Sequence, residues 1–266
     1  MKLSISNIAW PADHDADMYA FLKHKGFSGL EIAPTRIFPD KPYEHLAEAR
    51  DWAVQLKEVY GLAISSMQSI WYGRQEKVFG DKEERKTLIE YTRKACEFAK
   101  TIGCHNLVFG NPRNRETLDV AKDYPVAIDF FHEIGEIALE HDTIIAIEPN
   151  PTIYNTHFIN YTKQAVELVN NANSKGLKVN YDLGTVIENK EDISYIHDIA
   201  GVVNHIHISE PYLAPIDVAH HSQHKVLVAF AKKHENTYLS IEMGNKGDVE
   251  KVKQIVEYIK GITDEI

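Results

Sequence analysis

Short apolar runs and longer amphipathic segments alternate eight times along this sequence. The runs are rich in β-branched residues and have the length of buried strands. They occupy residues 3–7, 29–33, 62–67, 106–110, 143–148, 177–182, 205–209 and 238–242. Between them apolar residues recur at steps of three and four, as at Leu88, Tyr91, Ala95, Phe98 and Ile102, which is the pattern of a helix that covers a core. This alternation predicts repeated strand and helix units around a parallel sheet.

Glycines mark the points where several of the predicted helices end. The glycines that shortly precede a predicted strand are Gly26, Gly61, Gly103 and Gly176. Glycine adopts the left-handed conformation that follows a helix without a Cβ penalty. We therefore expect each of these four residues to end a helix.

The number of units favours a closed barrel over an open, doubly wound sheet. Eight strand and helix units in 266 residues match the usual size of such a barrel, about 250 residues. An open sheet that binds a nucleotide would carry a glycine-rich turn after its first strand, whereas residues 7–15 read NIAWPADHD. We predict an α/β fold with a single (β/α)8 TIM barrel domain over residues 1–266.

Composition limits the partners and the location of the chain. It is 44% hydrophobic with a net charge of −10, and its basic residues form no run, which argues against nucleic acid binding. The sequence shows no signal peptide pattern and no apolar stretch of about 18 residues, so we expect a cytoplasmic protein that does not bind a membrane. Cys96 and Cys104 lack CxxC spacing and are predicted to be reduced core residues.

Four successive predicted strands, the fifth to the eighth, each carry an ionisable residue at or near the carboxyl end. These residues are Glu148, Asp182, His207 and Glu242. Such a group costs several kcal/mol if it is buried without a partner, and the carboxyl ends of barrel strands meet at one mouth. A shared divalent metal ion is the simplest compensating partner. Three carboxylates and one imidazole suit Mn²⁺ first, with Mg²⁺, Co²⁺ or Zn²⁺ as alternatives.

Other residues near the same mouth are candidates to support the ion or to contact a substrate. His205 lies two residues before His207, so strand alternation places it one layer deeper, where it would orient the metal ligand. Glu31 lies near the end of the second predicted strand and is a further candidate for the pocket. His220 and His224 share a helix face, which leaves a second metal site as an alternative. The predicted substrate contacts are Asn7, Trp10, Gln68, Trp71, Arg113 and His157.

The strand-end motifs IEPN, YDLG, HISEP and SIEM resemble those of the xylose isomerase-like barrels in the sugar phosphate isomerase/epimerase superfamily. The resemblance covers essentially the whole chain. It implies that Glu148, Asp182, His207 and Glu242 hold one divalent ion and that Glu148 and Glu242 act as catalytic acid and base. It also implies that Glu210 contacts substrate hydroxyls. One departure is Thr185, which stands where many relatives have a histidine three residues after the aspartate.

These residues favour proton transfer next to a carbonyl group. A metal ion stabilises the resulting enolate charge, and two carboxylates supply the acid and the base. We expect a divalent-metal-dependent sugar or sugar-phosphate isomerase/epimerase that works through an enediolate, with a small-molecule sugar or sugar phosphate as its partner. A keto-sugar or keto-inositol dehydratase/lyase and a noncatalytic sugar-binding barrel are the alternatives, and a homo-oligomer stays open.

Overall fold

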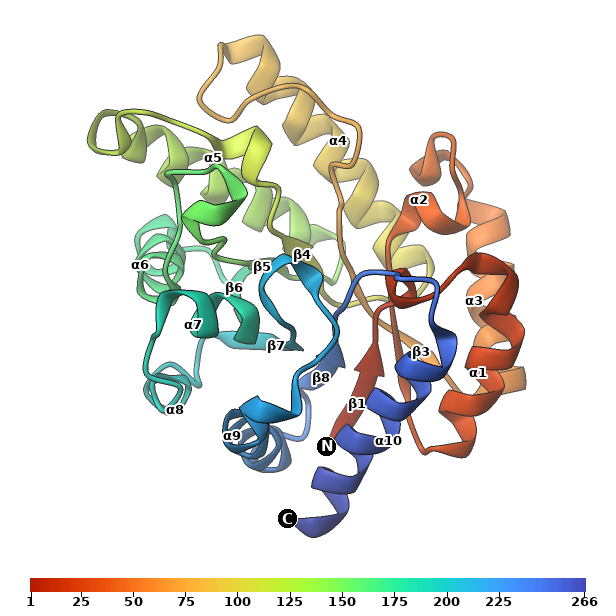
Figure 1. Cartoon of the computed structure of the whole chain (residues 1–266). Coiled ribbons are helices and arrows are strands. Elements are labelled where there is room, and N and C mark those ends of the chain that lie inside the picture. Colours follow the sequence, from red (N-terminus) through yellow and green to blue (C-terminus); the bar gives the residue numbers. More distant parts are fainter.

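Eight parallel strands form one nearly closed barrel in the computed structural model, which describes residues 1–266 (Figure 1). The strand order is β1-β8-β7-β6-β5-β4-β3-β2. A single bridge between Ser6, the residue after β1, and Glu31 of β2 joins the two edge strands. The predicted (β/α)8 TIM barrel is therefore confirmed. The strands are β1 Lys2–Ile5, β2 Gly29–Ile32, β3 Ala63–Met67, β4 Leu107–Phe109, β5 Ile145–Ile147, β6 Leu177–Asp182, β7 Val203–Ile208 and β8 Tyr238–Ile241.

Helices surround the strands and bury their apolar faces against them (Figure 1). The α-helices are α1 Asp15–His24, α2 Pro34–Ile37, α3 Leu46–Tyr60, α4 Lys82–Thr101, α5 Val120–Glu140, α6 Thr162–Ala172, α7 Leu183–Asn189, α8 Tyr195–Asp198, α9 His221–Lys233 and α10 Val249–Glu265. The 3-10 helices are η1 Asn7–Ala9, η2 Ala12–His14, η3 Pro42–Glu44, η4 Pro112–Arg115, η5 Thr152–Tyr154, η6 Pro211–Leu213 and η7 Val218–His220. None of the helices combines the length and the apolar character that crossing a membrane requires.

Glycine follows three of the helices in the left-handed conformation, as predicted. The φ angles of Gly26, Gly61 and Gly103 are 78°, 72° and 69°. The prediction for Gly176 is wrong, because α6 ends at Ala172 and Asn173 takes the left-handed conformation there. A Cβ atom on Gly176 would lie 1.9 Å from the backbone oxygen of Gly135 in α5, so Gly176 serves the close approach of two backbones.

The two cysteines are free and buried, as expected. Burial raises the pKa of both Cys96 and Cys104 to about 12. Both residues belong to the hydrophobic core.

The pairing of β6, β7 and β8 sets two layers of side chains at the mouth. An irregularity between Val179 and Asn180 in the β6–β7 pairing places Asn180 beside His205 and Asp182 beside His207. Side chains two residues apart on a strand share a face, so His205 and Asn180 lie one layer deeper than His207 and Asp182. The upper layer is the edge of the barrel where the strands end.

Candidate active site

Four side chains from four neighbouring strands meet at the carboxyl end of the barrel. Each offers one ligand atom, and these atoms all lie within 4.8 Å of one another in the cluster of Glu148, Asp182, His207 and Glu242. The backbone N–H of Glu148 donates to Phe109 O and that of Glu242 donates to Ile208 O, both at 2.9 Å. These bonds extend β5 and β8 by one residue, so a rigid backbone positions both carboxylates.

His207 presents a different ring nitrogen to each layer. Its Nδ1 lies 2.9 Å from Glu148 Oε1 and 3.2 Å from Glu242 Oε2, and its Nε2 lies 3.0 Å from Glu31 Oε2. Nε2 therefore faces Glu31 in the layer beneath, whereas Nδ1 faces the cluster. Burial opposes the charge on the ring, but Glu242 and Glu31 outweigh it and raise the pKa of His207 well above its ordinary value.

Glu31 and His205 form the layer beneath His207. Glu31 is fully buried, and its Oε2 also lies 2.8 Å from His205 Nε2, without hydrogen-bond alignment at that nitrogen. Burial lowers the pKa of His205, whereas the two histidines lower that of Glu31 despite its burial. The expectation that Glu31 lines the substrate pocket is wrong, because β2 continues to Ile32 and keeps Glu31 inside the barrel.

Asp182 is oriented by Thr185, three residues further along the chain. Asp182 caps α7, and its Oδ2 accepts the Thr185 N–H at 2.7 Å. The Thr185 hydroxyl lies 2.8 Å from the same oxygen and 2.8 Å from Pro149 O, and the Ser209 hydroxyl donates to Oδ1. Thr185 is buried and does not line the cavity. This position therefore supports Asp182 from behind.

Glu148 is held on several sides by groups behind it. Asn180 Nδ2 donates to Glu148 Oε1 at 2.7 Å, and a Cβ atom on Gly110 would lie 2.8 Å from Oε2. The fully buried Arg115 donates through Nη2 to Glu148 O at 3.0 Å and to Asn150 Oδ1 at 2.6 Å. Burial lowers the pKa of Arg115 to about 9. Arg115 lies in η4, where no periodic pattern in the sequence distinguishes it.

Burial and crowding raise the pKa values of two of the carboxylates. Burial, with the added charge of Glu148, raises the pKa of Asp182 to about 6. Burial also raises the pKa of Glu242 to about 7. His207 opposes this shift, whereas the charges of Glu148 and Glu31 add to it. A divalent cation would compensate this cluster, and three carboxylates with one imidazole nitrogen are a hard to borderline donor set that fits such an ion.

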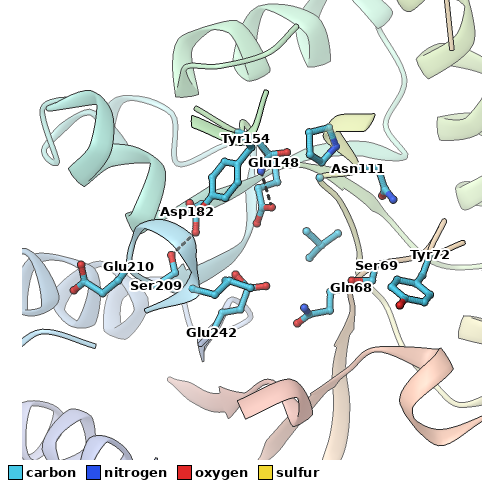
Figure 2. Close-up of a pocket in the computed structure, with 15 residues that line it drawn as sticks. Gln68, Ser69, Tyr72, Asn111, Glu148, Tyr154, Asp182, Ser209, Glu210 and Glu242 are labelled. Atoms are coloured by element: carbon cyan, nitrogen blue, oxygen red, sulfur yellow. Dashed lines mark hydrogen bonds between the residues drawn. The ribbon is translucent and has the colours of Figure 1, made fainter. Parts of the chain in front are cut away.

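A cavity of about 280 Å³ opens above the cluster (Figure 2). Of the predicted residues, Glu148, Asp182, Glu242, Glu210 and Gln68 line it. Figure 2 shows Glu148 and Glu242 entering the cavity from different strands. The cavity is lined by Gln68, Ser69, Tyr72, Val108, Gly110, Asn111, Pro112, Glu148, Asn150, Tyr154, Asp182, Ser209, Glu210, Leu213 and Glu242.

Three of the predicted substrate contacts are instead engaged in packing. Trp10 and Trp71 are buried, and their indole N–H groups donate to Asp15 Oδ1 at 2.8 Å and to Thr92 Oγ1 at 2.9 Å. Asn7 is also buried, and its Oδ1 accepts the N–H of Ala33 at 3.0 Å. None of the three lines the cavity.

Arg113 and His157 lie outside the cavity as well. Arg113 is exposed on η4, and its carbonyl oxygen accepts a hydrogen bond from Lys77 Nζ at 2.5 Å. His157 is exposed and pairs with Glu116. Both side chains therefore belong to the outer surface of the loops in this structure.

The histidines around the start of α9 do not assemble a second metal site. His220 Nδ1 lies 2.9 Å from Glu210 Oε1. His221 and His224 instead each place Nδ1 3.0 Å from the Tyr258 hydroxyl. The groups of side chains close enough to hold a metal ion include none of these histidines.

One protein family model matches most of the chain. Residues 19–260 match the family model of the xylose isomerase-like TIM barrel. The chain belongs to this family. The resemblance inferred from the strand-end motifs is thereby confirmed, whereas no curated protein sequence matches the chain significantly.

Solved structures share the barrel of this xylose isomerase-like protein at low sequence identity. The 3-keto-D-glucoside 4-epimerase from E. coli has a TM-score of 0.76 and 16% identity, with 98% of this chain and 99% of that chain covered. The D-psicose 3-epimerase from Clostridium cellulolyticum H10 has a TM-score of 0.76 and 14% identity, with 100% and 99% covered. A probable 3-DHS dehydratase from Bacillus anthracis has a TM-score of 0.72 and 15% identity, with 99% of both chains covered. At these identities the likeness is one of fold.

Proposed function

We propose that this barrel is a divalent-metal-dependent isomerase or epimerase of a sugar or sugar phosphate that transfers a proton through an enediolate. The observation that carries the proposal is the cluster of three carboxylates and His207 at the floor of an open cavity. Sugar epimerases among the proteins with the same fold support the reaction class.

We propose that Glu148, Asp182, His207 and Glu242 hold one divalent cation, with Mn²⁺ as the first choice. Burial and neighbouring carboxylates raise the pKa values of Asp182 and Glu242, and a divalent cation would favour the ionised form of both. Glu31 faces Nε2 of His207, which leaves Nδ1 on the side of the cluster. When bound, such an ion would polarise a substrate carbonyl as a Lewis acid.

Glu148 and Glu242 are the proposed acid and base. They come from β5 and β8 and point into the cavity from different sides (Figure 2). A substrate between them would lose a proton to one carboxylate and receive a proton from the other, which inverts a carbon centre. Isomerisation between adjacent carbons needs only one of the two. Glu210, whose carboxylate also lines the cavity, would bind a substrate hydroxyl.

A dehydratase on the same cluster is the second candidate function. Thr185 lies behind Asp182 and leaves the cavity without an imidazole from this position, which keeps this alternative open. The probable dehydratase of the same fold agrees with this alternative. It would use the same proton abstraction and then expel a β-hydroxyl group.

The test is a screen of ketoses and their phosphates in deuterated water with added Mn²⁺, followed by NMR. We expect deuterium at the carbon next to the carbonyl without loss of water. An unsaturated product would identify the dehydratase instead. Binding without exchange or product would identify a noncatalytic barrel and overturn the proposal. The cytoplasmic location and a homo-oligomer stay predictions that this screen does not address.

A further inference from the structure

We infer that the cavity selects an uncharged polyhydroxylated carbonyl compound and rejects substrates that carry a phosphate or carboxylate group. This inference rests on the proposed function and answers the question of substrate charge that it leaves open. Three features support it. The charged residues of the lining are all acidic, nearby hydrogen-bond donors are bonded within the protein, and the polar atoms left without a partner suit hydroxyl groups.

The lining of the cavity carries negative charge alone. It includes the carboxylates Glu148, Asp182, Glu210 and Glu242 and no lysine, arginine or histidine. One divalent cation at the cluster would compensate two of these four charges. Repulsion between like charges is stronger in such a partly buried site than in water, so a phosphate dianion would be disfavoured there.

Two arginines in the neighbourhood of the cavity form hydrogen bonds or ion pairs within the protein. Arg115 lies behind Glu148 and donates to a backbone oxygen and to Asn150. Arg74 pairs with Glu76. Neither of these guanidinium groups lines the cavity.

Backbone donors at the mouth are also engaged within the protein. Phosphate sites of TIM barrels are commonly built from the loops after the last two strands. Here the N–H of Tyr212 donates to the Tyr154 hydroxyl at 2.8 Å, and that of Leu213 donates to Glu210 O at 3.0 Å. The N–H of Gly244 donates to Leu213 O at 2.8 Å. These three groups are thus unavailable to an anion.

The polar atoms that remain free suit hydroxyl groups. Asn111 Oδ1 is a buried acceptor without a partner, and it needs a donor that a hydroxyl supplies and a phosphate dianion lacks. Gln68 Oε1 accepts from the Ser6 hydroxyl at 2.6 Å, which leaves the Gln68 amide N–H groups for a hydroxyl oxygen. The ring of Tyr154 also lines the cavity and adds an apolar edge that suits the C–H face of a sugar.

A neighbouring cavity of about 460 Å³ is the place where an anion would have to bind instead. It shares Tyr72 with the first cavity and is lined by Lys41, Arg74 and Lys94. Lys41 lies 3.6 Å from Glu44 and Arg74 pairs with Glu76, whereas Lys94 forms no ion pair. Lys94 is therefore the residue to vary when testing whether a phosphate reaches this second cavity.

The experiment is titration calorimetry of a panel of ketohexoses and their 6-phosphates, with inorganic phosphate as a further probe. Both the chelator-treated and the Mn²⁺-loaded protein are titrated. We expect the best neutral ketose to bind at least tenfold more tightly than its phosphate, and inorganic phosphate not to bind. Leu213→Arg places a cation at the cavity and should reduce this ratio at least tenfold. The matched control Leu118→Arg, at a side chain that is 91% exposed and lies outside the lining, should leave the ratio unchanged.

Equal or tighter binding of a phosphate by the wild type would overturn the inference. Loss of that binding in Lys94→Ala would place the phosphate group in the neighbouring cavity. The inference would still be overturned, because the protein would then accept a phosphorylated substrate. Failure to bind any neutral ketose would overturn it as well. Deuterium exchange is a separate measurement: tight neutral binding without exchange or product would reject the proposed function and leave the inference on charge intact.

Discussion

Arg115 is fully buried and donates a hydrogen bond to the backbone oxygen of Glu148, 3.0 Å away. The same nitrogen reaches Asn150 Oδ1, while Nε and Nη1 have no partner. The guanidinium lies 6.0 Å from the centre of the Phe109 ring. A buried cation, whose desolvation costs free energy, therefore lies beside the end of β5, where the Glu148 side chain enters the cavity.

Arg115→Ala should lower the free energy of unfolding and also misplace Glu148. Hydrogen bonds to charged groups contribute about 1.5–3 kcal/mol each, so we expect a loss of that order in urea unfolding, together with weaker Mn²⁺ binding. Arg93→Ala is the matched control, because the exposed Arg93–Glu140 pair should contribute less than about 1 kcal/mol. Equal losses in the two variants would contradict this role.

His207→Ala should abolish Mn²⁺ binding, whereas His205→Ala should weaken it about 10–100-fold, the usual effect of a group that orients a ligand. The reason is that His205 lies beneath His207 and faces Glu31, not the cluster. Titration of both variants with Mn²⁺ measures the difference. Equal abolition would make His205 a direct ligand.

Glu148→Gln and Glu242→Gln should each retain detectable Mn²⁺ while losing at least about 100-fold in turnover, the usual contribution of a general base. Glutamine keeps the size and one ligand oxygen but removes the base. Single-turnover deuterium exchange separates the roles. If the carboxylates serve opposite faces, each variant keeps exchange for one epimer, and full exchange of both epimers in either variant would refute the assignment.

His224 should make the protein less stable as the pH falls from about 6.5 to about 4. Burial, with two neighbouring histidines, lowers the pKa of His224 to about 4, and its ring packs edge-on against Tyr258. The unfolded chain takes up the proton near pH 6.5 and the folded protein only near pH 4, so stability is lost across this window. In His224→Gln, urea midpoints measured across it should fall less steeply. An unchanged slope would show that this ring does not govern the loss.

Cys96 and Cys104 should resist alkylation in the folded protein at pH 8, because burial raises both thiol pKa values to about 12 and the thiolate is the reactive form. Mass spectrometry after treatment with iodoacetamide should show no label in the native protein and two labels after denaturation in guanidinium. Rapid native labelling of either thiol would contradict its placement in the core.

Strand periodicity was enough to predict the barrel and the meeting of Glu148, Asp182, His207 and Glu242, because strand ends and side-chain alternation are local properties. The surroundings depend on contacts that are distant in sequence. Trp10 and Trp71 follow strands, as pocket residues do, and only their partners Asp15 and Thr92 turn them into packing residues.

Other parts of the site could not be predicted for the same reason. Arg115 has no periodic neighbours, and its burial follows from the packing of η4 over β4. Glu31 did carry a signal, since it is a carboxylate inside an apolar strand. Its depth depends on how far β2 extends, which pairing with β3 and the bridge to Ser6 determine.

Glu31 belongs to β2 beside the seam between the first two strands, yet it contacts His207 of β7. A chain in which β3 to β8 have assembled would already hold all four proposed ligands but would lack the anion that fixes the ring of His207. The orientation of that ring is therefore completed only when the second strand joins the sheet. Full affinity for the proposed ion would therefore require that the second and seventh strands, which lie 176 residues apart at this contact, have come together in one barrel.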